Sequence, residues 1–407
     1  MEVLELFKLR KNGFLKILGA ILTITSITGF FHSAILYYVI LGVFGLIVVY
    51  DLFTLGFVAN YRIIFFLAIC AFSLVVNVTP KFFNAWSRLG VYVLVLFVVS
   101  PMMSNAAIDV KRRKLLIYIM DTCIILSVLS FFCYFLGINL FLIQDENLEI
   151  GVGTFSGLMN HSMVLGPVSG LSFVVLLSYF LCEDNSLKRI GYLAAALCCL
   201  GSCFLSASRI AVGAAIVGWV SVLYIKYRTR LTRFAIVILV VLAVGGVTFP
   251  IWGGITDFLV QKQQISIDLG GSFMSSRESK FNARIIEFKS NPVCGIGFAT
   301  VDPLLDKVNL SDGQIEPGSS WLAILSMTGL LGLISFLSIC HNSYKKLKFM
   351  DDMFYSCTLG GLFVYYLIHL IAEGYIMAPG SFLNLLFWLV LGSINAKSDN
   401  LFEKMRS

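Results

Sequence analysis

Residues 275–298 read SSRESKFNARIIEFKSNPVCGIGF, a polar and basic stretch in a chain that otherwise consists mostly of apolar runs. Of the 407 residues, 58% are hydrophobic and only 13% are charged. Many of the apolar runs reach roughly 18 residues, the length that crosses a bilayer as a helix. Because lipid offers no water to an open backbone, these runs are expected to be helical. The sequence therefore predicts an all-α polytopic membrane protein with a single integral membrane domain over residues 1–407.

Hydropathy predicts about twelve transmembrane helices. They are expected over residues 14–31, 33–50, 61–78, 88–104, 114–137, 155–182, 189–206, 209–225, 233–252, 319–340, 353–373 and 380–395. The basic N-terminal stretch leads directly into the first apolar run without a small-residue cleavage site, so no signal peptide is predicted. Most of the cysteines lie in apolar runs as small hydrophobic residues, and neither a disulfide framework nor a zinc site is expected.

The distribution of lysine and arginine predicts the orientation. With a cytoplasmic N-terminus, the clusters KRRK at 111–114 and KYRTRLTR at 226–233 fall on the inner side, and the short outer segments hold few basic residues. Both termini are then cytoplasmic, and residues 253–318 form one long outer loop. The net charge of +7 reflects this anchoring and requires no nucleic-acid partner.

Within the long outer loop, two arginines and two phenylalanines alternate at helical spacing: Arg277, Phe281, Arg284 and Phe288. This stripe predicts an amphipathic helix that lies on the membrane and presents guanidinium groups to a lipid-linked phosphate. The alternative is an interfacial helix whose arginines contact lipid headgroups.

Two further segments carry polar groups at the outer ends of predicted spans. Ser208 and Arg209 lie at the junction of two apolar runs, where an arginine marks either a binding site or a snorkelling side chain. The span GSSWLAILSMTGLLGLI opens at Gly318 with small polar residues. Its Gly329 and Gly332 are expected to allow close contact between helices.

In this order, the segments resemble the O-antigen ligase and Wzy-type polysaccharide polymerase superfamily. The resemblance rests on Ser208-Arg209, Ser276-Arg277, Asn291-Pro292 followed by Gly-Ile-Gly, and a Leu-x-x-Leu-x-x-x-Gly-Leu-x-Gly helix at 322–332. Upstream, Gly-Leu-Met-Asn-His at 157–161 is similar to a Gly-x-x-x-His-Pro-Asn segment of the family. The resemblance covers roughly residues 150–395 and implies a GT-C-like membrane fold.

The chain departs from the family pattern at one position. Family ligases carry His-Asn eleven residues before the first glycine of the last motif, whereas this chain has Gly318-Ser319 there. The histidine usually assigned to activating the acceptor is therefore absent, which favours a repeat-unit polymerase over a ligase.

The resemblance implies a donor glycan on undecaprenyl pyrophosphate and an acceptor hydroxyl on a second lipid-linked unit. Negative charge grows on the departing pyrophosphate, and the guanidinium groups of Arg209, Arg277 and Arg284 suit its stabilisation. The sequence has no Asp-rich metal motif, so the reaction is expected to need neither metal nor cofactor. Glu316 and His161 are the candidates for the general base.

Further substrate contacts are expected from five residues: Ser208, Phe281, Asn160, Ser319 and Trp321. His369 and Glu373, one helical turn apart, are expected to share a helix face as a structural pair. The implied setting is the bacterial inner (plasma) membrane and synthesis of an O-antigen or capsule. The expected partners there are membrane lipids, a flippase and a chain-length regulator.

Two other functions fit the same composition. A ligase would transfer the glycan to a lipid core or a protein. A transporter or flippase of lipid-linked sugars or small anions would also have about twelve helices, but such folds usually show internal repeats, and none is visible here.

Overall fold

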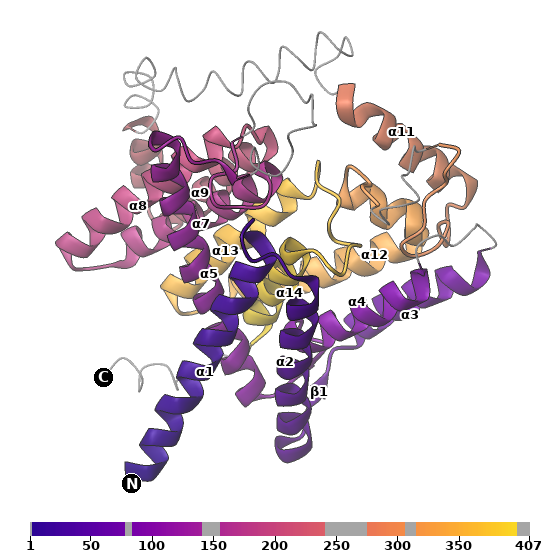
Figure 1. The fold of residues 1–407 in the computed structure, drawn as a ribbon, viewed down its shortest axis with the longest axis horizontal. Coiled ribbons are helices and arrows are strands. Elements are labelled where there is room, and N and C mark those ends of the chain that lie inside the picture. The colour runs from indigo at the N-terminus through magenta and orange to yellow at the C-terminus, as the bar shows by residue number, and fades with distance from the viewer. Residues whose placement is uncertain (1, 78–83, 141–154, 241–274, 306–314, 397–407) are drawn as a thin grey trace.

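The computed structural model describes residues 2–77, 84–140, 155–240, 275–305 and 315–396. These residues form a nearly all-helical structure (Figure 1). The helices are α1 (Glu2–Ile27), α2 (Ala34–Leu55), α3 (Tyr61–Val76), α4 (Ala85–Val99), α5 (Ala106–Phe135), α7 (Ser162–Cys182), α8 (Ser186–Leu205), α9 (Arg209–Tyr227), α11 (Ser275–Ser290), α12 (Ser320–Lys348), α13 (Met353–His369) and α14 (Phe382–Asn395). Two short strands, β1 (Val58–Ala59) and β2 (Met103–Ser104), pair antiparallel with Val58 opposite Ser104.

The predicted membrane spans agree with the observed helices. Among the described residues, six helices are long and apolar enough to cross a membrane, and six shorter apolar helices accompany them. Each of the twelve predicted spans overlaps one of these helices, although part of the span at 233–252 lies outside the described residues. The prediction of an all-α polytopic membrane protein is confirmed.

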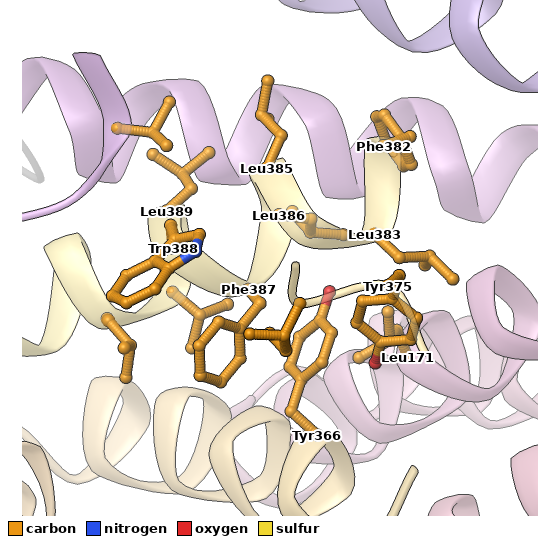
Figure 2. Packing of buried hydrophobic residues seen from close by; sticks show 14 of the residues in the cluster. Leu171, Tyr366, Tyr375, Phe382, Leu383, Leu385, Leu386, Phe387, Trp388 and Leu389 are labelled. Atoms are coloured by element: carbon orange, nitrogen blue, oxygen red, sulfur yellow. The ribbon is translucent and has the colours of Figure 1, made fainter. Parts of the chain in front are cut away.

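Helix α14 lies at the centre of the core. All of its residues are buried, as expected for a helix that is apolar on every side, and it packs against α4, α5, α12 and α13. Figure 2 shows Phe387 of this helix between Trp388 of the same helix and Tyr366 of α13. The ring centroids of Phe387 and Tyr366 are 5.4 Å apart, and those of Trp388 and Phe336 of α12 are 6.2 Å apart. These aromatic contacts tie α12 and α13 to the same central helix.

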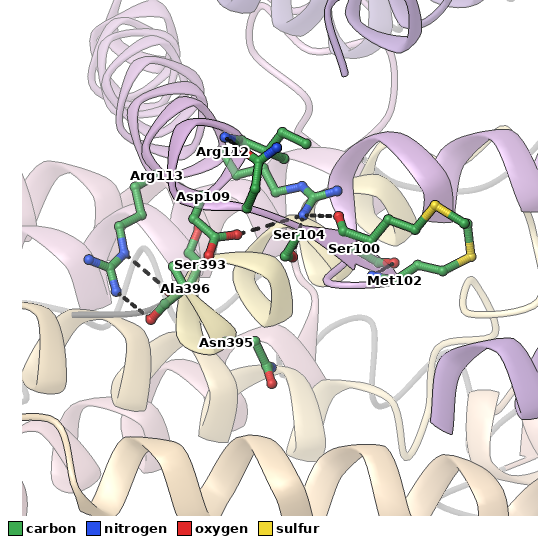
Figure 3. A network of polar contacts seen from close by, with 12 residues as sticks. Ser100, Met102, Ser104, Asp109, Arg112, Arg113, Ser393, Asn395 and Ala396 are labelled. Atoms are coloured by element: carbon green, nitrogen blue, oxygen red, sulfur yellow. Dashed lines mark hydrogen bonds and ion pairs between the residues drawn. The ribbon is translucent and has the colours of Figure 1, made fainter. Parts of the chain in front are cut away.

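Two arginines of the basic cluster at 111–114 are structural (Figure 3). The Arg112 side chain donates to the Val98 carbonyl, 2.9 Å away, near the end of α4. Arg113 donates to the carbonyls of Ser393 (3.3 Å) and Ala396 (3.1 Å) at the end of α14. Cations at these positions satisfy the last carbonyls of a helix. The cluster predicted as a membrane anchor therefore also caps two helices.

Helix α11 ends at Ser290, before Pro292 as predicted, and the turn that follows fits into a break in α12. The break is at Gly329, whose φ of 66° is a left-handed conformation that glycine adopts without strain. The turn satisfies the interrupted helix: the Leu330 N–H donates to the Pro292 carbonyl (2.9 Å), and the Ile296 N–H donates to the Ser326 carbonyl (2.8 Å). Gly329 thus allows close approach, as predicted, but of a turn rather than of another helix.

This inserted turn fixes where α11 lies. It fastens the C-terminal end of α11 to the middle of α12, and the two helices pack together. In Figure 1, α11 lies on the side of the molecule away from the N-terminal end of α1. The N-terminal half of α11 is thereby placed beside the start of α12.

Candidate functional site

Arg277 connects α11 to the start of α12 and to the turn after α13. Its Nη2 lies 2.6 Å from Oε1 of Glu373, and its Nη1 donates to the Gly318 carbonyl, 3.1 Å away. A quarter of the Arg277 side chain (25%) remains exposed. The guanidinium is therefore held in place and can still be reached by an anion.

Glu373 is fixed by its own backbone. Its carbonyl accepts the Ser320 N–H (2.9 Å) and the Ser320 hydroxyl (2.5 Å) at the first turn of α12. The neighbouring Gly374 packs against Pro317, and no side chain would fit there. The turn that carries Glu373 is therefore clamped to the segment that carries Gly318.

The predicted pairing of His369 with Glu373 is wrong. Helix α13 ends at His369, so Glu373 lies in the following turn instead of one helical turn further along. Nδ1 of His369 lies 3.1 Å from the Tyr375 hydroxyl, and its ring stacks on Tyr365 with centroids 5.4 Å apart. His369 is fully buried and has a packing role, whereas Glu373 faces Arg277.

Arg209 is the first residue of α9 and follows a tight turn. Ala207 in this turn has a φ of 53°, and the Ser206 hydroxyl accepts the Ser208 N–H, 3.3 Å away. Ser208 takes the N-cap position and is half-buried, as is Arg209. The charge of Arg277 acts on Arg209, so the two arginines that the motifs singled out lie within electrostatic range of each other.

Arg284 has a different environment. Its side chain is 0% exposed, and its Nη2 lies 3.0 Å from Oε1 of Glu287, which also accepts the Asp302 N–H at 2.8 Å. Burial raises the pKa of the Glu287 carboxyl, while the charge of Arg284 and the Asp302 N–H oppose that rise. The expectation that Arg284 contacts a phosphate is therefore wrong for this conformation, because a fully buried side chain cannot contact a substrate. The arginine stripe of α11 faces the protein instead of a membrane surface.

The position of the missing histidine is confined. Gly318 has a φ of 77°, and a Cβ on it would lie 3.1 Å from Cβ of Lys280 and 3.4 Å from the ring of Phe281. Both neighbours belong to α11, and Phe281 is half-buried there. A larger side chain at 318 would strain the backbone and push against α11. A histidine at position 318, where family ligases carry one, would therefore be crowded by α11.

Glu316, one of the two candidate bases, lies at the surface. Its side chain is 60% exposed and forms an ion pair with Lys280. Exposed pairs of this kind contribute little to stability. In the described part of the chain, Arg277 contacts Gly318 and Glu373, whereas Glu316 contacts Lys280.

His161, the other candidate base, caps α7. Its Nδ1 accepts the Met163 N–H at 3.0 Å, which satisfies one of the first amides of the helix. The Asn160 N–H donates to the Ile27 carbonyl (2.9 Å), so both residues are at the junction of α1 and α7. A Cβ on Gly166 of α7 would touch the Ser206 hydroxyl at 2.6 Å. The junction therefore adjoins the turn that carries Arg209.

Ser319 and Trp321, expected to contact substrate, take structural contacts. Ser319 is 2% exposed, and its hydroxyl accepts the Leu322 N–H (3.4 Å) as the N-cap of α12. Trp321 donates to the Leu367 carbonyl (3.3 Å) and packs on Phe336 with ring centroids 5.5 Å apart. Both residues fasten α12 within the bundle.

The model of the O-antigen ligase family matches residues 194–337 of the chain. Over this region, about a third of its length, the chain is similar to the O-antigen ligase family. The match includes Arg209, Arg277 and the start of α12, whereas His161 and Glu373 lie outside it. No curated protein matches the chain. The family indicates an O-antigen ligase or polymerase type of function in surface polysaccharide synthesis, with lipid-linked oligosaccharides as substrates.

Glu373 is the site residue whose role the sequence did not reveal. Its contact with Arg277 joins positions 96 residues apart, which no local pattern shows. The sequence did contain one signal. A carboxylate at the end of an apolar span is energetically unfavourable unless it has a partner, and Arg209 and Arg277 on the same predicted outer face were candidate partners.

Proposed function

We propose that this protein is a repeat-unit polymerase of surface polysaccharide synthesis. It transfers the growing glycan from undecaprenyl pyrophosphate to a hydroxyl of an incoming lipid-linked repeat unit. The observation that carries the proposal is that Arg277 is held beside the start of α12, near enough to Arg209 for its charge to act on that residue, and that both arginines lie in the region matched by the O-antigen ligase family model.

We also propose that this site faces away from the cytoplasm. The basic clusters at 111–114 and 226–233 belong to the opposite ends of the spans, and basic residues favour the cytoplasmic side. The chain would then lie in the bacterial inner membrane with both termini in the cytoplasm, and α11 would belong to a long outer loop over residues 253–318.

The transfer breaks the bond between the anomeric carbon and a phosphate oxygen and forms a bond from that carbon to the acceptor oxygen. The pyrophosphate leaves with the bonding electrons, and the acceptor hydroxyl loses its proton. Arg209 and Arg277 stabilise the departing charge, since a guanidinium fork binds two phosphate oxygens and stays ionised. Electrostatic stabilisation at fixed positions is a large part of catalysis in such sites.

The confined space at Gly318 supports a polymerase over a ligase. Family ligases have a histidine at this position, and here the left-handed backbone and the close approach of α11 disfavour one. The acceptor site is therefore built differently from that of the ligases. A second lipid-linked repeat unit is the acceptor that fits a polymerase.

Substitution of the two arginines by lysine tests the proposal. Arg209→Lys and Arg277→Lys keep the charge but lose the fork, so each is expected to lose most polymer synthesis while the protein still accumulates in the membrane. Arg228→Lys, at the other end of α9, is the matched control and should synthesise polymer normally. Wild-type amounts of long polymer from both site variants would make these arginines interfacial anchors only.

The glycans that accumulate in cells lacking the protein separate the candidate functions. Loss of a polymerase leaves single repeat units on the final acceptor. Loss of a ligase leaves long lipid-linked chains, and loss of a flippase traps the units in the cytoplasm.

A further inference from the structure

The contacts around Arg277 also bear on how the acceptor hydroxyl loses its proton. This step rests on the proposed function, since it concerns the same transfer. Other carboxylates on α11 and its flanks have other environments: Glu278 is exposed on the first turn of α11, Glu287 is buried against Arg284, and Glu316 is exposed beside Lys280. His161 is used as a helix cap at the junction of α1 and α7.

Glu373 combines three properties that a proton acceptor needs in this site. Its carboxylate lies 2.6 Å from Arg277, so it is next to the guanidinium that is proposed to bind the pyrophosphate. Its side chain is 15% exposed, which shields it from bulk water and leaves it reachable. Its backbone is clamped to Ser320 and its neighbour Gly374 to Pro317, next to the position where family ligases carry histidine.

We propose that Glu373 is the general base of the transfer and replaces the histidine that is absent at position 318. In the resting protein its carboxylate is held by Arg277. When phosphate oxygens of the donor take up the Arg277 fork, Glu373 is released from its cation, and an anion comes to lie nearby. Both changes make a carboxylate a better proton acceptor.

The step balances without a further reactant. The acceptor O–H bond breaks, and its proton moves to a carboxylate oxygen of Glu373. The oxygen's electron pair forms the bond to the anomeric carbon, and the bond from that carbon to the pyrophosphate oxygen breaks. Glu373 then returns its proton to water, and Arg277 pairs with it again as the lipid pyrophosphate leaves. Donor binding thus activates the base.

Glu373→Gln tests the proposal in purified protein supplied with lipid-linked repeat units. The amide oxygen can still accept a hydrogen bond from Arg277 but cannot take a proton at neutral pH. Turnover is expected to fall by roughly 100- to 10,000-fold, while donor binding changes by less than about threefold. Asp351→Asn, which changes an exposed carboxylate just before α13 in the same way, is the control and should keep its turnover.

A second variant separates catalysis from simple positioning of Arg277. Glu373→Ala opens space for a small carboxylate, and added formate is expected to restore part of its turnover. Formate should not restore Arg277→Lys. Glu373→Asp, which keeps the carboxylate on a shorter side chain, should fall between wild type and Glu373→Gln.

Two results would overturn the assignment. Turnover of Glu373→Gln within threefold of wild type would exclude a general base at this position. Equal losses of donor binding and turnover, with no response of Glu373→Ala to formate, would mean that Glu373 only holds Arg277. If the wild-type protein itself does not elongate lipid-linked units, the proposed polymerase function fails instead.

Discussion

Two arginines on α11, Arg277 and Arg284, lie two helical turns apart on the same stripe and have opposite environments. Arg277 is 25% exposed and pairs with Glu373, a residue of a distant turn. Arg284 is 0% exposed and pairs with Glu287 on its own helix. The same residue type at helical spacing is thus partly exposed at one end of α11 and part of the interior at the other.

The two ion pairs differ in the free energy that is needed to separate the arginine from its carboxylate. A pair at a partly exposed site is weakened by water, so another anion can replace its carboxylate. Opening a buried pair leaves charges without solvent, which is strongly unfavourable. On the proposed function, Arg277 would exchange Glu373 for a phosphate, whereas Arg284 would stay with Glu287.

The largest expected effect on stability is at the buried pair. Arg284→Met is expected to destabilise the protein by about 3–5 kcal/mol, because Glu287 is left as a buried carboxylate without its cation. Arg277→Met should destabilise the protein less than Arg284→Met, because Glu373 is only partly buried and keeps some contact with water, although the variant is expected to abolish polymer synthesis. Thermal unfolding in detergent, with protein levels in the membrane, measures both. Equal destabilisation by the two variants would remove the distinction between the ends of α11.

A second prediction concerns the pH dependence of the Arg284→Met variant. Burial raises the pKa of the Glu287 carboxyl, and loss of Arg284 removes the charge that opposes this rise. A carboxyl with a higher pKa in the folded chain than in the unfolded chain stabilises the fold most below its ordinary pKa. That stability is lost as pH rises through the folded-state value. The deficit of Arg284→Met should therefore be small in acid and grow toward neutral pH.

The double variant Arg284→Met with Glu287→Gln provides the control for this effect. It has no carboxyl at position 287, so its stability relative to wild type should not follow the pH trend of the single variant. It should also be more stable than Arg284→Met at neutral pH, since no lone charge is buried. A parallel pH trend in both variants would assign the effect to another group.

Much of the fold followed from the sequence because its causes are local. Spans are set by hydropathy, and α11 by the spacing of its stripe and by Pro292. The spacing of Arg284 and Glu287 is also local, but the sequence-based prediction assigned Arg284 to the pyrophosphate and did not include this pair.

What the sequence did not predict depends on tertiary contacts. Gly329 looks like a helix-packing glycine, and only the inserted turn after α11 shows that it breaks α12. In the sequence, Arg112 and Arg113 have the pattern of membrane-anchoring charges. Only the structure shows that they bind the carbonyls at the ends of two helices. The pairing of Arg277 with Glu373 depended on α13 ending at His369, a boundary inside an apolar run that hydropathy does not mark.

The smallest expected effect is at the pair between Lys280 and Glu316, which lies beside the site but at the surface. Glu316 is 60% exposed, and removal of its charge by Glu316→Gln should change the free energy of unfolding by less than about 1 kcal/mol. Turnover should stay within about twofold of wild type, because this carboxylate is on the outer flank of α11 and its partner is not one of the arginines of the site. Steady-state rates with lipid-linked repeat units, measured beside Glu373→Gln, provide the test. A loss of 100-fold or more in Glu316→Gln would return the role of base to the exposed flank, and Glu373 would then serve only to hold Arg277.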